Sequence, residues 1–387
     1  MTRSQVSGGS VQPRAEALID AAAIAANTAA LKDAAGVAGV MAVVKADGYG
    51  HGLLTSARAA LAGGAASLGV ALPEEALALR AAGIDASVLA WLVQVDDHDA
   101  WRSLVQADVE VSVSSQRSLA AAVSAASDTG RPARIHLKVD TGLGRGGAAL
   151  KQWPDLVAAT ARSQAEQAVE VVGAWTHLAF ADHPEHPVID AQLAAFTDAL
   201  TIAEGAGVSP LVRHMANSAA TILRPDTHFD LVRPGIGLYG ISPGSFVGTP
   251  ETLGLQPAMT LRARVSQVKR VPAGHGVSYG HEYTTQRDTT LALLPVGYAD
   301  GIPLSASSRG PLQLGGRRRT VAGRVCMDQV VVDVGDDVVS EGDTAVLFGP
   351  AATGAPTVAE WAEAANTISY EIVTRIGPRV VRTVTGN

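Results

Sequence analysis

The 387-residue sequence is short of several residue types, and each shortage narrows what the protein can do. It has one cysteine, Cys326, so no disulfide can form within the chain, and a reducing, cytoplasmic setting is expected. It lacks any stretch of about 18 apolar residues, which argues against a membrane span. It has no long run of one charge and a net charge of only -7, which argues against nucleic acid or an anionic membrane as the partner.

Apolar residues are abundant, at 47% of the sequence, which is enough for a large core. A length of 387 residues favours two domains. Residues 1–13 lack the apolar core of a signal peptide and are predicted to be a flexible leader. Charged residues make up only 17% of the chain, and we expect a protein that acts on small molecules.

Between about residue 15 and Pro257, short β-rich apolar runs alternate with longer alanine-rich segments at helical spacing. The alanine-rich segments are good helix formers and end at glycine. The apolar runs lie at 41–45, 67–71, 88–92, 109–113, 134–140, 169–178, 211–217 and 229–235. Eight β–α repeats over roughly 240 residues predict a (β/α)8 barrel. A doubly wound open sheet is the alternative.

The pattern changes near Pro257, where alternation with a period of two takes over, as in MTLRARVSQVKRV. Glycine and proline turns separate these runs, which predicts a mainly antiparallel β domain. A helix is expected in TVAEWAEAAN, where Thr357 and Glu360 can form a capping box. We therefore expect the barrel to occupy residues 14–253 and the β domain residues 254–387.

The strand ends of the predicted barrel carry many polar residues, and chemistry in such a barrel collects at the carboxyl ends of the strands. The first apolar run ends in Lys45, and Tyr49 follows in the sequence KADGYGHG. Later strand ends supply Lys138, Asp140, Arg145, His177, His214, Asn217, Ser218, Arg233, Gly235 and Ile236. A cluster this polar is costly to bury without partners.

Each of these residues also has an ordinary structural explanation. A lysine at a strand end is more often a solvated charge, and a glycine-rich turn after a strand is usually only a turn. The turn DGYGHG matches neither the Walker loop nor the dinucleotide-binding GxGxxG pattern. His177 can equally be a satisfied core histidine, and Arg233 can cap a loop. The functional interpretation therefore depends on these residues meeting at one face.

Pyridoxal phosphate would account for the whole set, because lysine forms a Schiff base with its aldehyde. Its phosphate needs hydroxyl and backbone N–H groups, which Tyr49, Ser218, Gly235 and Ile236 can offer. Its ring nitrogen needs a protein partner: an arginine would keep that nitrogen neutral, whereas an aspartate would keep it protonated. The sequence gives no reason to expect a metal ion.

Eight motifs in this order along the chain resemble the alanine racemase family: AVVKADGYGHG, KVDTGLGRGG, HMANSAA, VRPGIGLYG, VSYGHEY, GYADG, RVCMDQ and TISYE. The resemblance runs from about residue 15 to Arg382. It implies an isomerase that interconverts L- and D-alanine with pyridoxal phosphate and supplies D-alanine for peptidoglycan. It also implies a homodimer, since in this family the partner subunit contributes to each active site.

The resemblance gives the central residues expected roles. Lys45 would carry the cofactor and act as one catalytic base, and Tyr279, supplied by the second subunit, would be the other. Arg233 would hydrogen-bond the pyridine nitrogen, and His214 would support that arginine. His177 would orient the catalytic tyrosine.

The remaining residues would bind the phosphate or the substrate. Arg145 would contact the cofactor's phenolic oxygen and the substrate carboxylate, and the backbone N–H of Met327 would hold that carboxylate. Lys138 matches a lysine often found carbamylated, whose anion would hold Arg145. Tyr298, with Tyr370, would form a substrate-entry gate. The phosphate-binding and supporting positions are Tyr49, Asn217, Ser218, Gly235, Ile236, Tyr370 and Asp328.

Other functions share parts of this plan. A decarboxylase of basic amino acids has a barrel and a β domain but uses a catalytic cysteine, and Cys326 lies in the racemase-type block RVCMDQ. A pyridoxal-phosphate-binding protein without enzymatic activity resembles a lone barrel, which the predicted β domain argues against. A barrel without any cofactor is the simplest alternative.

Overall fold

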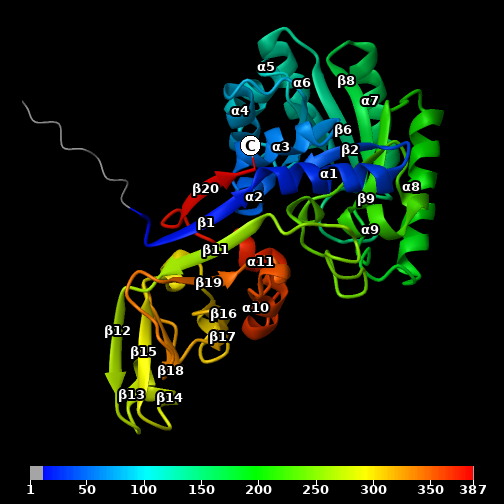
Figure 1. Cartoon of the computed structure of the whole chain (residues 1–387). Coiled ribbons are helices and arrows are strands. Elements are labelled where there is room, and N and C mark those ends of the chain that lie inside the picture. The colour runs from blue at the N-terminus through cyan, green and yellow to red at the C-terminus, as the bar shows by residue number, and fades with distance from the viewer. Residues whose placement is uncertain (1–11, 387) are drawn as a thin grey trace, which may run out of the picture. The chain divides into compact units, whose positions relative to one another are not determined.

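The computed structural model describes residues 12–386, which form two compact units (Figure 1). Among the described residues, the barrel unit spans Asp20–Ala258 and residues 385–386. The β unit joins residues 12–19 to Met259–Val384. Residues 1–11 of the expected leader lie outside the described residues, and residues 12–13 are in neither helix nor strand. No helix within 12–386 has the length and apolar character needed to cross a membrane.

A closed barrel of parallel strands forms the centre of the barrel unit. In the described chain its eight strands are β2 (Gly39–Val43), β3 (Ser67–Val70), β4 (Ser87–Ala90), β5 (Glu110–Val113), β6 (Ala133–Asp140), β8 (Val169–Trp175), β9 (Val212–Asn217) and β10 (Leu231–Arg233). Each pairs with the next, and β10 also pairs with β2, which closes the ring. The (β/α)8 prediction is confirmed, and the open sheet is excluded.

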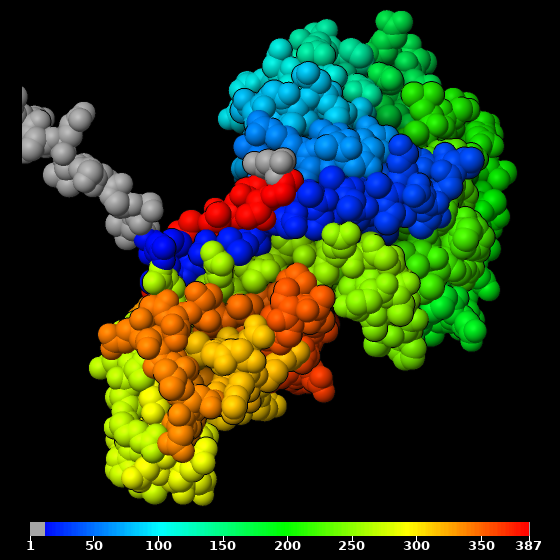
Figure 2. Space-filling view, in the orientation of Figure 1, coloured from blue at the N-terminus to red at the C-terminus, as the bar shows by residue number. Residues whose placement is uncertain are grey.

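Helices alternate with the barrel strands along the chain, starting with one helix before β2. On the face shown in Figure 2, segments coloured from blue to green form the outer surface of this unit. These helices are α1 (Ala21–Ala35), α3 (Leu53–Ala62), α4 (Pro73–Ala81), α5 (His98–Gln106), α6 (Gln116–Thr129), α7 (Trp153–Ala165), α8 (Val188–Gly205) and α9 (Ser218–Leu223). Caps define their ends: Asp20 accepts from the Ala23 N–H at the start of α1, and Gly36 follows its end with φ +64°.

The β unit is mainly antiparallel, as predicted. Its larger sheet has the order β17 (Arg317–Thr320), β16 (Pro311–Leu314), β19 (Thr344–Phe348), β11 (Met259–Arg264), β1 (Ala15–Asp20) and β20 (Val381–Thr385). A second sheet has the order β12 (Gln267–Val271), β15 (Thr289–Leu294) and β18 (Val330–Gly335). Short elements of this unit are β13 (Gly276–Val277), β14 (Tyr283–Thr284), α10 (Val358–Ala365) and α11 (Ser369–Thr374). The short strand β7 (Ala148–Ala149) belongs to the barrel unit, where it pairs with β6.

The first strand differs from its expected place. The sequence predicts a barrel that begins at residue 14, but β1 pairs antiparallel with β11, with Ala15 opposite Ala263 and Ile19 opposite Met259. Its burial alternates with a period of two, as expected of a sheet with one covered face. The helix near the end has the expected capping box, in which the Glu360 N–H donates to Thr357 Oγ1 at 3.2 Å and the Thr357 N–H to Glu360 Oε2 at 2.7 Å.

Candidate active site

Lys45 stands at the carboxyl end of β2, at the start of an unusual left-handed turn, α2 (Lys45–Tyr49). Ala46, Asp47 and Tyr49 have φ values of 54°, 53° and 52°, a region that costs L-residues roughly 1–2 kcal/mol each. Two hydrogen bonds hold the turn: Ala46 N–H to Glu75 Oε1 at 2.6 Å, and Leu53 N–H to Asp47 Oδ1 at 2.8 Å. Backbone strain of this kind concentrates at functional sites.

The environment of Lys45 shifts its amine towards the neutral form. Burial and the positive charge of Arg145 lower the pKa of Lys45, and the carboxylate of Glu75 opposes them in part. Only a neutral amine can attack a carbonyl or accept a proton. The lysine that ended an apolar run in the sequence therefore has surroundings that favour the form needed by a nucleophile or a base.

A group of donors suited to a phosphate surrounds the start of η2 (Ile236–Tyr239). A Cβ added to Gly235 would lie 2.4 Å from the hydroxyl oxygen of Tyr49, so the buried tyrosine reaches the backbone only because this residue is glycine. Ser218 Oγ accepts from the Gly235 N–H at 2.8 Å. Asn217, just before it, caps α9 by accepting from the Ala219 N–H at 3.1 Å.

Arg233 lies at the end of β10 and is only 4% exposed. Its guanidinium donates to two carbonyl oxygens, those of Thr176 at 2.7 Å and Met215 at 3.2 Å. It also lies 3.1 Å from His214 Nδ1 and 3.3 Å from His177 Nδ1. All four described partners are neutral acceptors, and burial lowers the pKa of Arg233 to about 9.

Both histidines beside Arg233 are neutral bases. Burial, followed by the charges of Arg233 and Arg145, holds the pKa of His177 well below its usual range. Burial and the charge of Arg233 do the same for His214. A neutral imidazole can accept at one nitrogen while it donates at the other. Each ring can therefore receive a hydrogen bond from the guanidinium.

Lys138 adds another cation to this side of the barrel. Its ammonium lies 4.1 Å from the centre of the Trp175 ring. Burial, then the charges of Arg233 and Arg145, lower the pKa of Lys138 to about 8. Arg145 itself is exposed, on the loop after β6 whose backbone N–H groups at 142–144 donate to Asp140 Oδ1. The barrel residues named from the sequence thus form one predominantly positive cluster, which suits an anionic ligand.

The other predicted site residues lie in the β unit and gather around one loop. The Tyr298 N–H donates to the Cys326 carbonyl at 3.0 Å, next to Met327. The Ser278 hydroxyl donates to the Arg324 carbonyl at 2.7 Å, which brings Tyr279 to the same loop. The tyrosine is 70% exposed and Met327 53% exposed. Large exposed apolar groups that cluster in this way are typical of interaction sites.

Two further predicted residues lie beside this loop. Asp328 pairs with Arg379 at 2.7 Å. Tyr370 lies on α11, whose end adjoins the short helix of Tyr298, because the Gly377 N–H donates to the Asp300 carbonyl at 3.0 Å.

Three residues that the sequence did not single out contact the cluster, namely His136, Trp175 and Thr176, and a fourth, Glu110, reaches it through His136. In the sequence Glu110 and His136 stand out only as members of apolar strands. The alternation in RIHLK gave a usable signal, because Arg134, His136 and Lys138 must share one face of a strand.

Comparisons with known proteins place the chain in a family. The alanine racemase N-terminal domain matches residues 19–243, and the alanine racemase C-terminal domain matches residues 258–384. An alanine racemase of Frankia casuarinae is 55% identical over 369 residues, 95% of this chain and 96% of that protein.

Comparison with solved structures gives the same family. The alanine racemase of Streptomyces lavendulae has a TM-score of 0.96 and 54% identity, covering 97% of this chain and 98% of that one. That of Bacillus anthracis, solved with bound L-Ala-P, has a TM-score of 0.88 and 30% identity, covering 98% and 97%. The chain belongs to the alanine racemase family, a family of isomerases.

Proposed function

We propose that this protein racemises alanine with pyridoxal phosphate, using Lys45 and Tyr279 as its two bases. The observation that carries the proposal is the strained turn that presents Lys45, with a lowered pKa, on the same barrel as a buried Arg233. When bound, the cofactor would acidify the α-proton of the amino acid joined to it.

The residues present fit this cofactor. The hydroxyls of Tyr49 and Ser218 and the backbone around Gly235 and Ile236 supply neutral donors for a phosphate, and Gly235 leaves the space that the tyrosine hydroxyl needs. Tyr370 would add a further hydroxyl. Arg233 would donate to the ring nitrogen. Because a guanidinium donates a hydrogen bond but does not release its proton at neutral pH, the ring nitrogen would stay unprotonated.

The two bases would work from opposite faces. Tyrosine has an ordinary pKa of about 10 and lysine of about 10.4, so both need a lowered pKa near neutrality. Burial and Arg145 supply this for Lys45. Tyr279 is 70% exposed in a single chain, which supports its insertion into the site of a second copy, where His177 would orient it.

The substrate carboxylate would be held by Arg145 and the backbone N–H of Met327, with Tyr298 and Tyr370 at the entrance. Lys138 would hold Arg145 in place as a carbamate. The carbamate forms when the neutral amine of Lys138 bonds to the carbon of CO2 and releases a proton. A pKa of about 8 leaves an appreciable fraction of this amine neutral. The resulting anion would offset the cluster's positive charge.

The D-alanine formed would be used for peptidoglycan. The reaction would take place in the cytoplasm, a reducing compartment that suits a protein with one cysteine. The L-Ala-P bound to the relative from Bacillus anthracis supports a site that accepts alanine-like ligands.

The function is tested by mixing purified, cofactor-loaded protein with either enantiomer of alanine. Optical rotation is followed over time, and the amounts of both enantiomers are measured by chiral chromatography. Both reactions are expected to reach a one-to-one mixture, and Lys45→Ala should abolish them. Release of CO2 and consumption of the added enantiomer, without formation of the opposite enantiomer, would instead indicate a decarboxylase. Absence of turnover, with the cofactor attached to Lys45, would contradict the proposal.

A further inference from the structure

Four buried side chains form one continuous hydrogen-bonded line through the barrel interior. Glu110 Oε2 lies 3.0 Å from His136 Nε2, His136 Nδ1 lies 2.9 Å from His214 Nε2, and His214 Nδ1 lies 3.1 Å from Arg233 Nη1. Their exposed fractions are 3%, 1%, 0% and 4% in that order. The line begins at the first residue of β5 and ends at the last residue of β10.

The chemistry of the two ends gives this line one direction. A guanidinium can only donate and a carboxylate can only accept. Arg233 therefore donates to His214 Nδ1, which puts the proton of that ring on Nε2. His214 Nε2–H then donates to His136 Nδ1, and His136 Nε2–H donates to Glu110. One arrangement of protons satisfies every link.

The surrounding residues hold both imidazole rings in place. A Cβ on Gly173 would lie 2.3 Å from His136 Nδ1, so the neighbouring strand leaves room for this ring by having a glycine. The Trp175 ring lies nearly parallel to His214, with centroids 5.6 Å apart, and its indole N–H donates to Ser112 Oγ at 3.1 Å. The geometry is thus built around the two rings.

The line also connects Arg233 to a negative charge. The four described hydrogen bonds of the guanidinium all go to neutral acceptors, and a buried cation without compensation is costly. The Glu110 carboxylate lies at the far end and is further held by Arg134 at 2.7 Å. Chains of hydrogen bonds polarise one another in a low-dielectric interior.

We propose that Glu110 and His136 are positioning residues of the active site. By keeping the proton of His214 on Nε2, they keep Nδ1 available to Arg233 and fix the guanidinium in one orientation. The step from Arg233 to the ring nitrogen of pyridoxal phosphate rests on the proposed function. The assignment of the His214 proton does not.

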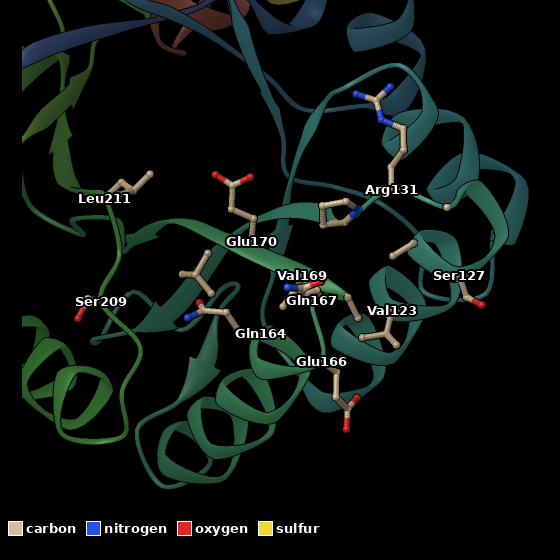
Figure 3. Close-up of a pocket in the computed structure, with 15 residues that line it drawn as sticks. Val123, Ser127, Arg131, Gln164, Glu166, Gln167, Val169, Glu170, Ser209 and Leu211 are labelled. Carbon is tan, nitrogen blue, oxygen red and sulfur yellow. The ribbon is translucent and has the colours of Figure 1, made fainter.

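The outer end of the line offers a matched control. Arg134 also faces Glu170 at 3.9 Å, and the Glu170 side chain is 50% exposed. Glu170 lies at the start of β8, where it lines a pocket with Arg131 and Gln167 (Figure 3). It shares the charge and the arginine neighbour of Glu110, but it has no described bond to His136.

The test is solid-state NMR of cofactor-loaded protein with 15N-labelled histidine, because 15N shifts distinguish protonated from bare ring nitrogens. Signals of His214 are assigned by their loss in His214→Gln. The wild-type protein is expected to show a neutral His214 with its proton on Nε2. In Glu110→Gln the amide can donate as well as accept, so a second form with the proton on Nδ1 is expected. Glu170→Gln should match the wild type.

The same variants are compared for alanine racemisation and for the visible absorbance of bound pyridoxal phosphate. Glu110→Gln is expected to shift the absorbance and to lower kcat/KM about tenfold, the size seen for outer hydrogen-bond partners of functional histidines. Glu170→Gln is expected to change neither.

A wild-type His214 with its proton on Nδ1, or with both nitrogens protonated, would overturn the proposal even if Glu110→Gln did not fold. A Glu110→Gln protein with the wild-type tautomer would also overturn it. A changed tautomer with unchanged absorbance and rate would break the link to the cofactor. If the wild-type protein has the expected tautomer but does not racemise alanine, the proposed function fails and the assignment of Glu110 stands.

Discussion

The hydroxyl oxygen of Tyr49 occupies the space beside Gly235 so closely that a Cβ there would stand 2.4 Å from it. The two residues come from opposite ends of the barrel sequence, one from the strained turn after β2 and the other from the residues after β10. Their contact joins the lysine-bearing turn to the proposed phosphate-binding backbone.

Gly235→Ala should therefore weaken cofactor binding without unfolding the barrel. The added methyl group would displace the Tyr49 hydroxyl, and loss of a hydrogen bond to a charged group costs about 1.5–3 kcal/mol. We expect the Kd for pyridoxal phosphate to rise at least about tenfold, as measured by titration of the cofactor-free protein. Gly205→Ala, where a Cβ meets nothing within 4 Å, is the control. Equal affinities in the two variants would argue against a phosphate site here.

Glu75→Gln should change the pH dependence of cofactor attachment to Lys45. The amide oxygen can still accept the Ala46 N–H, whereas the amide nitrogen cannot accept the Ala71 and Leu72 N–H groups that Glu75 Oε2 holds. The negative charge that raises the pKa of Lys45 is lost. The pKa of Lys45 then falls, more of the amine is neutral at a given pH, and the rate profile should move to lower pH. Stopped-flow absorbance after mixing with pyridoxal phosphate measures this. Glu74→Gln, an exposed neighbour, should leave the profile in place. A shift to higher pH would contradict the account.

Lys138→Gln should stabilise the cofactor-free protein in buffer without CO2. The folded pKa of about 8 lies below the ordinary 10.5, so the unfolded chain binds more protons between these values. Stability should therefore rise with pH across that window and be least below pH 8. Removing the buried cation should raise the unfolding free energy at neutral pH by on the order of 1–2 kcal/mol and flatten the rise.

Urea unfolding over a pH series tests this. Lys151→Gln serves as the control, since that lysine is exposed. Destabilisation of the Lys138 variant at neutral pH would show that the ammonium contributes more than its burial costs.

Tyr279→Phe should leave the cofactor bound and remove one of the two bases. Loss of a positioned base typically costs about 100-fold or more in rate, and we expect kcat to fall by that amount in both directions. Tyr283→Phe is a matched control in the same unit, because its hydroxyl donates to Asp333 at 2.7 Å and serves the fold. Near-normal turnover of Tyr279→Phe, measured by chiral chromatography, would exclude this tyrosine as a base.

The sequence predicted the barrel well because its strands are apolar runs separated by alanine-rich helices, some of which end at glycine, as α1, α3 and α6 do. It placed residues 15–19 with the barrel, because they directly precede the first alanine-rich segment, and it did not identify them as a strand. It could not foresee the left-handed turn, because Ala46 and Asp47 are not residues that demand positive φ.

The residues of the candidate site also divide into those that local sequence indicates and those that it does not. Lys45, Ser218 and Arg233 stand at the ends of predicted strands, so the barrel prediction was enough to expect them at one face. Glu110 and His136 lie within strands, and only the closed barrel reveals that they meet across β5, β6 and β9. Pairing between distant strands is long-range information that local periodicity does not hold.

The most direct test of a two-base racemase is the fate of the α-proton in heavy water. L-Alanine is incubated with cofactor-loaded protein in D2O, and both enantiomers are recovered at low conversion for mass spectrometry. If Tyr279 removes the proton from one face and Lys45 delivers a solvent-derived deuteron to the other, D-alanine carries deuterium while the remaining L-alanine keeps protium. Protium retained in the D-alanine would mean that one base carries the same proton between faces, and would contradict the two-base account.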